Sequence, residues 1–334
     1  MRCFLLTVFA LLSLVFISPF SHAAVTLPDE PIEEHPLDIV LPRDFPLPVT
    51  EKTIEAEGLK ILVFGDSGTG DEIQLKVAQA MKDFCAKQGC HLALMLGDNI
   101  HPAGVSSVNV PQFIEKFEKP YAGLGLPIFA ILGEHDWGRN GKMYNWRAQI
   151  DYTKKSKTWR MPSDVYSLTI GDVKIIALNT NSFQVSKMQK AWLKKGLEES
   201  KARWNLVMGH KPIFSYGYHG DTDFLIEDVL PLLCGKVDLY LSAHEHKQQV
   251  LKADCGLPLV VSGSAGKLRP EEETGPRALF NLPEPGFAYL WIKKNEMIVQ
   301  IVSAAGEVRY RMVIPKGPSG LKTSTPASSK QKEE

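Results

Sequence analysis

Residues 60–98, KILVFGDSGTGDEIQLKVAQAMKDFCAKQGCHLALMLGD, decide the fold that we predict for this chain. The apolar runs at 60–66 and 91–98 are typical of buried strands, and the segment 71–84 between them has the apolar spacing of a helix. A strand, a helix and a second buried strand predict a right-handed parallel βαβ unit. The run LPIFAILG at 126–133 predicts a third buried strand.

Strand and helix signals continue through the rest of the chain. The stretch 164–180 predicts a hairpin that turns at Gly171 and Asp172, and two later hairpins turn near Lys294–Asn295 and near Ala305–Gly306. The remaining elements are expected as helices near 186–200 and 221–234 and as strands at 204–210 and 237–244. This order predicts an α/β fold of two sheets with helices outside them.

The two ends of the chain differ in composition from its middle. Residues 1–23 combine an N-terminal arginine, an apolar run and a small-residue cleavage pattern, which predicts a secretory signal peptide and a secreted or periplasmic protein without a membrane anchor after cleavage. Residues 24–58 are rich in proline and acidic residues and are expected to form an extended arm. We expect a single domain over 59–315 and a disordered tail over 316–334.

Four cysteines remain after the expected cleavage: Cys85, Cys90, Cys234 and Cys255. An even number in an oxidising compartment predicts two disulfides, and three pairings are open.

The charge of the chain is balanced, with 38 basic and 38 acidic residues. With no stretch of basic and interleaved aromatic residues, the sequence predicts neither a nucleic-acid surface nor a basic membrane-binding face.

Acidic residues and histidines gather where the expected strands end. Six of the nine histidines, counting His219, lie in or just after these loops. The residues that follow the strands are Asp66, Asp98, His101, Glu134, His135, Asp136, His210, His244 and His246. In open α/β sheets this edge is where ligand sites form. Two divalent ions about 3.5 to 4 Å apart need a shared carboxylate and further oxygen or nitrogen ligands, and the chain supplies that number.

Taken singly, these residues have ordinary structural interpretations. A lone aspartate after a strand often caps the next helix, a task that Asp71 is also placed to do. The glycines of FGDSGTGD match neither G-x-G-x-x-G nor a Walker motif, so they favour a sharp turn around Asp66 over a phosphate loop. No G-x-S-x-G segment is present to support a serine hydrolase.

The ordered motifs GDSG, GDNIH, GEHD, VMGH and AHEH resemble those of the calcineurin-like metallophosphoesterases. Within that superfamily the chain is similar to the small, tartrate-resistant type of purple acid phosphatase, over about residues 60–312. The segment HKPIFSYGYHGDT at 210–222 adds to the likeness. The resemblance implies a four-layer α/β/β/α sandwich of two mixed sheets flanked by helices.

The resemblance also implies a role for each motif residue. One metal would be held by Asp66, Asp98, His101 and His246, and a second by Asp98 as a bridge with Glu134, His210 and His244. His135 would contact the phosphate and protonate the leaving oxygen. Asp136 would hold the His135 ring, and His219 would help to orient the substrate.

Three positions depart from the family pattern. His101 stands where the family has the tyrosine that binds ferric iron, which predicts a weaker preference for Fe(III) and no purple colour. Glu134 replaces an asparagine ligand and adds a negative charge that opposes an incoming phosphate. Ala243 replaces a glycine, which is tolerable unless that position needs a positive φ.

These inferences predict an exported phosphohydrolase with two metal ions, Fe, Zn or Mn, in which a metal-bound hydroxide attacks phosphorus in line. Its substrate is expected to be a phosphomonoester, either a small molecule or a phosphoprotein. The alternatives are a phosphodiesterase on the same site and a noncatalytic phosphate- or metal-binding protein with a degenerate site.

Overall fold

The computed structural model describes residues 36–41, 43–137, 145–184, 186–269, 273–317 and 322–324. Two eight-stranded sheets form the centre of the fold. The first sheet contains, in spatial order, β1 (Leu37–Leu41), β6 (Tyr166–Ile170), β7 (Val173–Ala177), β8 (Trp204–Met208), β9 (Leu239–Ser242), β11 (Pro258–Ser262), β10 (Gln248–Lys252) and β12 (Ala278–Leu282). The second contains β16 (Lys322–Ser324), β15 (Val308–Pro315), β14 (Glu296–Ser303), β13 (Gly286–Ile292), β2 (Leu59–Phe64), β3 (Leu92–Met95), β4 (Ile128–Ala130) and β5 (Trp159–Arg160).

Both sheets are mixed, as expected. Strands β2, β3, β4 and β5 run parallel to one another, and so do β7, β8, β9 and β11. The expected hairpins form as antiparallel pairs, β6 with β7, β13 with β14 and β14 with β15. The parallel runs matter for function because their carboxyl ends share an edge of each sheet.

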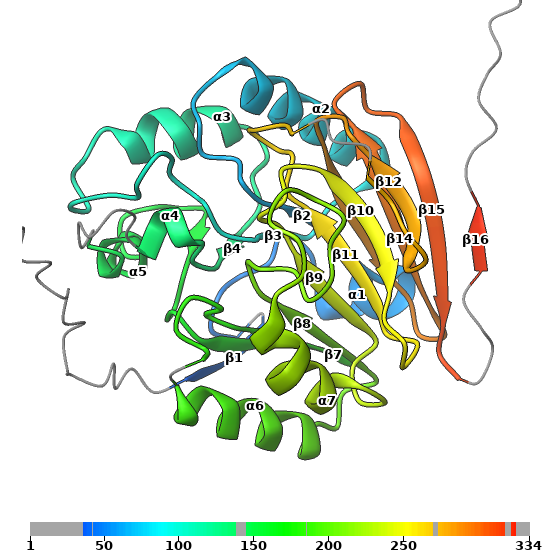
Figure 1. Cartoon of the computed structure of the whole chain (residues 1–334). Helices are drawn as coiled ribbons and strands as arrows, with labels where there is room; N and C mark the ends of the chain where they lie inside the picture. The colour runs from blue at the N-terminus through cyan, green and yellow to red at the C-terminus, as the bar shows by residue number, and fades with distance from the viewer. Residues whose placement is uncertain are drawn as a thin grey trace, which may run out of the picture. The chain divides into compact units, whose positions relative to one another are not determined.

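Helices cover the outer faces of the two sheets (Figure 1). The helices of the described residues are α1 (Glu51–Glu57), α2 (Glu72–Gln88), α3 (Lys119–Tyr121), α4 (Glu134–Trp137), α5 (Arg147–Tyr152), α6 (Lys187–Glu198) and α7 (Leu230–Leu233), with π-helical turns η1 (Ile114–Glu118) and η2 (Leu225–Val229). Helix α1 is an exception, since its Ile54 packs on the core between the sheets. Helix α2 begins after Asp71, whose side chain accepts a hydrogen bond from the Gln74 N–H. Because Asp71 caps the helix, Asp66 is left for another role.

Apolar side chains fill the layers between these elements. The largest core cluster joins the facing sides of the two sheets, for example Val63 of β2 and Leu206 of β8. A second cluster joins the other face of the first sheet to α6 and α7, through residues such as Val207 and Leu193. Helix α2 packs on the second sheet through Phe84, whose ring lies 5.1 Å from that of Tyr289. The layers are therefore helix, sheet, sheet and helix, the predicted sandwich.

The ends of the chain contain more regular structure than the sequence indicated. Within the expected arm 24–58, strand β1 pairs in parallel with β6 and α1 forms a helix. Strand β16, within the expected tail, pairs with β15. The predicted signal peptide, residues 1–23, lies outside the described residues. Among the described residues, no helix has the length and apolar character needed to cross a bilayer.

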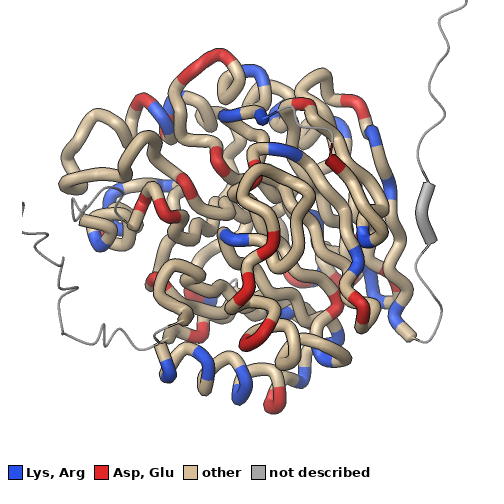
Figure 2. Tube along the Cα trace, viewed as in Figure 1, with Lys and Arg blue, Asp and Glu red and all other residues tan. Residues whose placement is uncertain are grey.

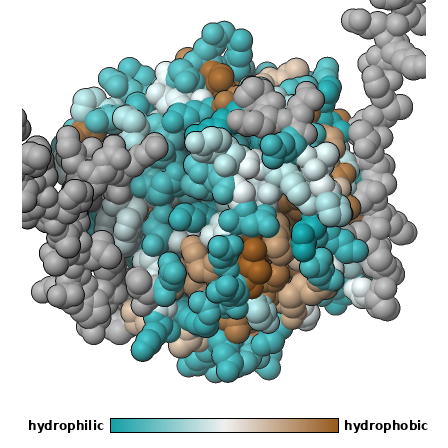
Figure 3. Space-filling view, in the orientation of Figure 1, coloured by the Kyte–Doolittle hydropathy of each residue, from teal (hydrophilic) through white to brown (hydrophobic). Residues whose placement is uncertain are grey.

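Two disulfides form, between Cys85 and Cys90 and between Cys234 and Cys255. They select one of the three pairings that the sequence left open. Basic and acidic residues are interspersed along the described chain (Figure 2). The face shown in Figure 3 is largely hydrophilic, with apolar side chains gathered in its lower half.

Candidate metal centre

The predicted ligands converge where the parallel strands of both sheets end. Asp66 and Asp98 follow β2 and β3, Glu134 follows β4, and His210 and His244 follow β8 and β9. Their donor atoms form two groups, in each of which all of the atoms lie within 4.8 Å of one another. The first group is Asp66, Asp98, His101 and His246, and the second is Glu134, His210 and His244. The first group contains the residues that the resemblance implied for one metal. The second contains those implied for the other metal except Asp98, which lies close to Glu134 in a further group with His135.

Backbone conformation shows how strongly the fold constrains this site. Among the described residues, the non-glycine residues with positive φ are Asp66 (53°), Asp98 (52°), His244 (75°) and His246 (50°). This region costs free energy for an L-residue with a side chain and persists only where surrounding structure enforces it. Ala243 is absent from that set, so its replacement of a glycine brings no backbone strain.

Close packing fixes the position of Asp98. A Cβ added to Gly133 would lie 2.2 Å from Asp98 Oδ1, so only glycine lets the loop after β4 approach this carboxylate. The same Oδ1 accepts a hydrogen bond of 2.9 Å from the His135 N–H. Asp66 Oδ2 likewise accepts one of 2.7 Å from the His244 N–H. One oxygen of each aspartate is therefore fixed by a backbone N–H.

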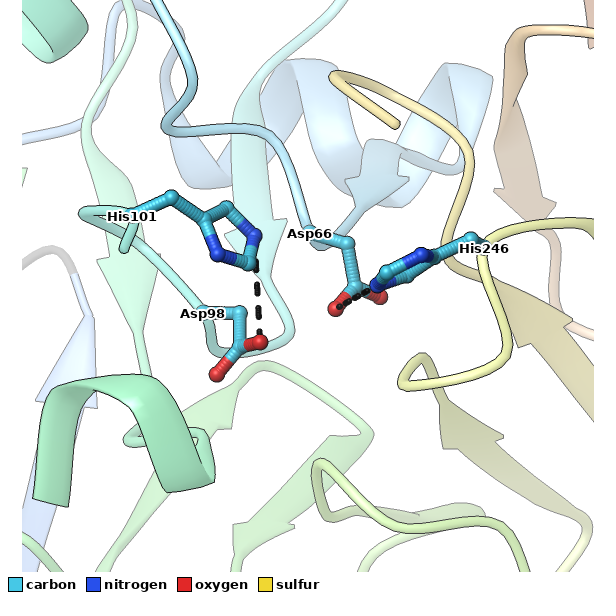
Figure 4. Close-up of side chains that lie close together, drawn as sticks. All are labelled: Asp66, Asp98, His101 and His246. Carbon is cyan, nitrogen blue, oxygen red and sulfur yellow. Dashed lines mark ion pairs between the residues drawn. The ribbon is translucent and has the colours of Figure 1, made fainter. Parts of the chain in front are cut away.

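The first group has the arrangement of a metal site (Figure 4). Asp66 Oδ1, Asp98 Oδ2 and His101 Nε2 are buried atoms with no hydrogen-bond partner among the described residues. Asp66 Oδ1 lies 3.6 Å from His246 Nε2, and Asp98 Oδ2 lies 3.7 Å from His101 Nε2. These separations are too long for hydrogen bonds and close to the roughly 3 to 3.5 Å between donors around an ion bonded at about 2.1 Å. The residues of the first group therefore fit a metal ion.

Electrostatics in the first group also favours an ion. Burial, followed by the charge of Glu134, raises the pKa of Asp66 well above its usual value. Burial, followed by the charge of Lys267, lowers the pKa of His101 to about 2. Burial together with Arg269 and Lys267 lowers the pKa of His246 to about 3. Both imidazoles are therefore neutral, which is the form that binds a metal.

The donor atoms of the second group lie closer together than those of the first. Glu134 Oε2 lies 2.7 Å from His210 Nε2 and 3.1 Å from His244 Nδ1. His210 Nδ1 donates to the Leu96 carbonyl at 2.8 Å, which fixes Nε2 toward the site. Burial lowers the pKa of His210, but the carboxylates of Asp98 and Glu134 outweigh it and raise that pKa to about 9. Without a metal, the second group is therefore an ion pair between Glu134 and a protonated His210.

His135 faces both groups. Its ring Nδ1 lies in hydrogen-bonding contact with the Pro102 carbonyl, which leaves Nε2 toward the site, 3.6 Å from Asp98 Oδ2 and 3.9 Å from Glu134 Oε1. This is the position expected of a group that contacts the substrate.

The prediction that Asp136 holds the His135 ring is wrong. The Asp136 carboxylate accepts backbone hydrogen bonds from Asn99, Ile100 and Gly133 and one from Gln149 Nε2. Adjacent residues on a short helix point in different directions, so Asp136 turns inward under the loop that carries Asp98. Asp136 thus positions the ligand loops, and the Pro102 carbonyl takes the expected place beside the ring.

His219 lies at the mouth of the site. Its ring stacks on that of His244 with centroids 4.1 Å apart, and its Nε2 accepts from Arg269 Nη1 at 3.1 Å. Its backbone N–H donates to Glu245 Oε2 at 3.1 Å. Burial, His244 and Arg269 lower the pKa of His219 to about 4. An open hollow of about 460 Å³ adjoins it, lined by Gln184, Lys211, His219, Asp221, Thr222, Asp223, Phe224 and His244.

Sequence reasoning missed the residues around the ligands. Lys267 and Arg269 lie near the site and match no motif considered above, and Glu245 lies within the AHEH motif but was given no role. A signal was present, because the apolar run at 258–262 also ends in glycines, with Lys267 and Arg269 shortly after it. The strand-end rule that found the ligands also applies to β11.

Comparison with known proteins agrees with this geometry. Residues 59–248 match the calcineurin-like phosphoesterase family. The chain belongs to the calcineurin-like phosphoesterases. Membership in this family implies a metal-dependent phosphoesterase, and the two ligand groups described above fit that chemistry.

Two of the curated relatives of this calcineurin-like phosphoesterase are acid phosphatases. It is 30% identical to the tartrate-resistant acid phosphatase type 5 of Oryctolagus cuniculus over 77% of this chain and 91% of that protein. It is also 30% identical to the type 5 enzyme of Homo sapiens, over 68% of this chain and 80% of that protein.

Solved structures share the fold. GAP50, the anchor in the inner membrane complex of Plasmodium, matches with a TM-score of 0.69 and 25% identity over 78% of this chain and 89% of its own. The purple acid phosphatase PPD1 from yellow lupin (Lupinus luteus) matches with a TM-score of 0.61 over 77% of this chain and 53% of its own, at 14% identity. The lupin likeness concerns the fold alone.

Proposed function

We propose that this protein is an exported phosphomonoesterase that uses two metal ions. The observation that carries the proposal is the placement of Asp98 between the two ligand groups. Its Oδ1 lies 3.7 Å from His210 Nε2 of the second group, and its Oδ2 lies 3.7 Å from His101 Nε2 of the first. A carboxylate shared by two sets of donors is what a pair of adjacent metal ions requires.

The residues of the site divide the chemistry among them. Two metal ions held by these groups would polarise the phosphoryl oxygens and lower the pKa of a water molecule. His135, with Nε2 toward both groups, is placed to give a proton to the leaving oxygen. His219, at the mouth, is placed to orient the substrate, and Asp136 keeps the loop of Asp98 in position.

Two observations support a phosphate ester as the substrate. The curated relatives named above are acid phosphatases, which favours a phosphate ester as substrate. The adjoining hollow is open, so it admits either a small molecule or a phosphorylated side chain of a protein. A phosphodiesterase is the alternative within the same chemistry.

A noncatalytic phosphate- or metal-binding protein is a second candidate, and Glu134 is the observation that favours it. At 2.7 Å from His210 Nε2, this carboxylate neutralises the second group without a metal. One structural neighbour, GAP50, is described as an anchor. The departures at 101 and 134 thus bear on catalysis as well as on metal preference.

Export is part of the proposal. The apolar N-terminal segment has the pattern of a signal peptide, and two disulfides fit an oxidising compartment such as a periplasm or the medium.

Elemental analysis of the protein, purified without chelator or added metal, tests the proposed function. Two transition-metal ions per chain, with hydrolysis of p-nitrophenyl phosphate, are expected. Asp98→Asn is expected to lose both ions, whereas Asp66→Asn loses the first, because only Asp98 faces both groups. A protein that takes up no Fe, Zn or Mn on reconstitution would exclude the enzyme and leave the binding function.

A further inference from the structure

The loop that leaves β11, residues 263–269, lies across the loops that carry the first ligand group. Thr69 Oγ1 donates to the Gly266 carbonyl at 3.3 Å, and the Arg269 N–H donates to the His246 carbonyl at 3.0 Å. A Cβ on Gly266 would lie 2.5 Å from the Ser67 carbonyl oxygen, so the two backbones are in close contact. The loop is therefore fixed on both sides of the site.

This loop carries two cations that point toward the ligands. Lys267 Nζ lies 3.3 Å from His101 Nδ1. Arg269 Nη1 lies 3.1 Å from His219 Nε2, and its guanidinium group stacks on the ring of Tyr218, 4.2 Å from the centroid. Lys267 thus adjoins the first ligand group, while Arg269 adjoins the mouth. The neighbours that hold these cations, His101, His219 and Tyr218, are uncharged and so do not neutralise them.

The net charge of the site explains why two additional cations would help to bind a phosphate. The two ligand groups contain three carboxylates, those of Asp66, Asp98 and Glu134. Two divalent ions would leave a net charge of only about +1, because Glu134 brings a negative charge that an uncharged ligand would not. A phosphomonoester arrives as a dianion close to pH 7, since its second pKa is about 6. Lys267 and Arg269 supply the additional positive charge.

Lys267 also has a free donor to offer once a metal is present. The ammonium group donates to Nδ1 of His101 in the structure described here. If His101 binds a metal through Nε2, its ring proton lies on Nδ1, and that atom no longer accepts. The half-buried ammonium then needs another acceptor, and a phosphate oxygen is one that the site would provide.

We propose that Lys267 and Arg269 bind the phosphate group of the substrate and select phosphomonoesters over diesters. A monoester offers three terminal oxygens and two charges, whereas a diester offers two oxygens and one charge. Two cations beside the phosphate therefore favour the monoester. This inference rests on the proposed function, because it assigns the substrate class of the same site.

The test is the binding of inorganic phosphate, measured by isothermal titration calorimetry on protein loaded with metal. The variants are Lys267→Gln, Arg269→Gln and the double variant, with Lys267→Arg as the conservative replacement. Lys252→Gln is the control, because it removes one charge from an exposed position at the end of β10. Elemental analysis of every sample confirms equal metal content. Parallel kinetics compare p-nitrophenyl phosphate with bis(p-nitrophenyl) phosphate.

Each single Gln variant is expected to bind phosphate about tenfold more weakly, in line with the loss of one charge-assisted hydrogen bond. Lys267→Arg and the control retain affinity within about twofold. The monoester is expected to lose more kcat/KM than the diester. Wild-type affinity in the double variant, at equal metal content, would overturn the inference and leave the proposed function intact. A wild-type protein that holds two metals but binds no phosphate would overturn both.

Discussion

Replacing Glu134 with glutamine should destabilise the metal-free protein in a manner that depends on pH. Glu134 Oε2 lies 2.7 Å from His210 Nε2, and the carboxylates of Asp98 and Glu134 raise the pKa of that imidazole to about 9, against the lowering by burial. The unfolded value is close to 6.5. A rise of about 2.5 units corresponds to about 3 kcal/mol of stability, shared between the two carboxylates.

The sign of the pH dependence follows from the raised pKa of His210. A protonated His210 stabilises the folded state fully below pH 6.5, and this contribution is lost as the pH rises through about 9. Because Asp98 supplies part of it, Glu134→Gln is expected to cost about 1 to 2 kcal/mol at pH 6 and almost nothing at pH 10.

The assay is urea unfolding in the presence of a chelator, at pH 6 and at pH 10, with two-state behaviour checked by two spectroscopic probes. Glu55→Gln, at an exposed position of α1, is the control for removal of one carboxylate charge. An equal loss of stability at both pH values would refute the ion pair as the cause. If Glu134→Gln instead stabilised the protein at pH 6, the negative charge of Glu134 would be a net cost to folding despite its pairing with His210.

Three further predictions concern the metal groups. Metal uptake should release protons and strengthen as the pH rises, because burial raises the pKa of both aspartates of the first group, Asp66 and Asp98. Titration calorimetry in buffers of different ionisation enthalpy measures the proton release, and binding heats that do not depend on the buffer would contradict it. Gly133→Ala should weaken metal binding by at least about tenfold, because the new Cβ would lie 2.2 Å from Asp98 Oδ1. The control is Gly196→Ala in α6, whose Cβ would meet atoms no closer than 3.8 Å and should leave metal binding unchanged. The double variant His101→Tyr with Glu134→Asn should gain ferric iron and visible absorption; a colourless protein with only divalent metals would refute this assignment of ligands.

Local patterns in the sequence predicted most of the secondary structure. The hairpin turn at Gly171 and Asp172 and the helix at 186–200 appear where expected, because turn chemistry and apolar period act within a few residues. The arm at 24–58 was a harder case. Strand β1 depends on pairing with β6, which lies more than a hundred residues further along the chain, and no local signal encodes that partner.

The site was predicted as a set of residues but not as an arrangement. The strand-end rule and the motif order indicated the candidate ligands. The structure brings these residues together in groups, of which the second lacks the expected Asp98. The partner of Asp136 was not predictable, because its side chain binds backbone groups of Asn99 and Gly133, whose orientation depends on the loops. Lys267 and Arg269 belong to no motif, and only the crossing of their loop over the site reveals them.

The sequence by itself determined most of the elements, the family and a set of candidate ligands. These properties depend on the spacing of apolar residues and on the chemical types at the ends of strands, which neighbours along the chain define. Only the tertiary structure decided that Glu134 pairs with His210 and that Lys267 adjoins His101. Those contacts join loops from two different sheets, and their geometry is set by how the sheets pack, which sequence spacing does not specify.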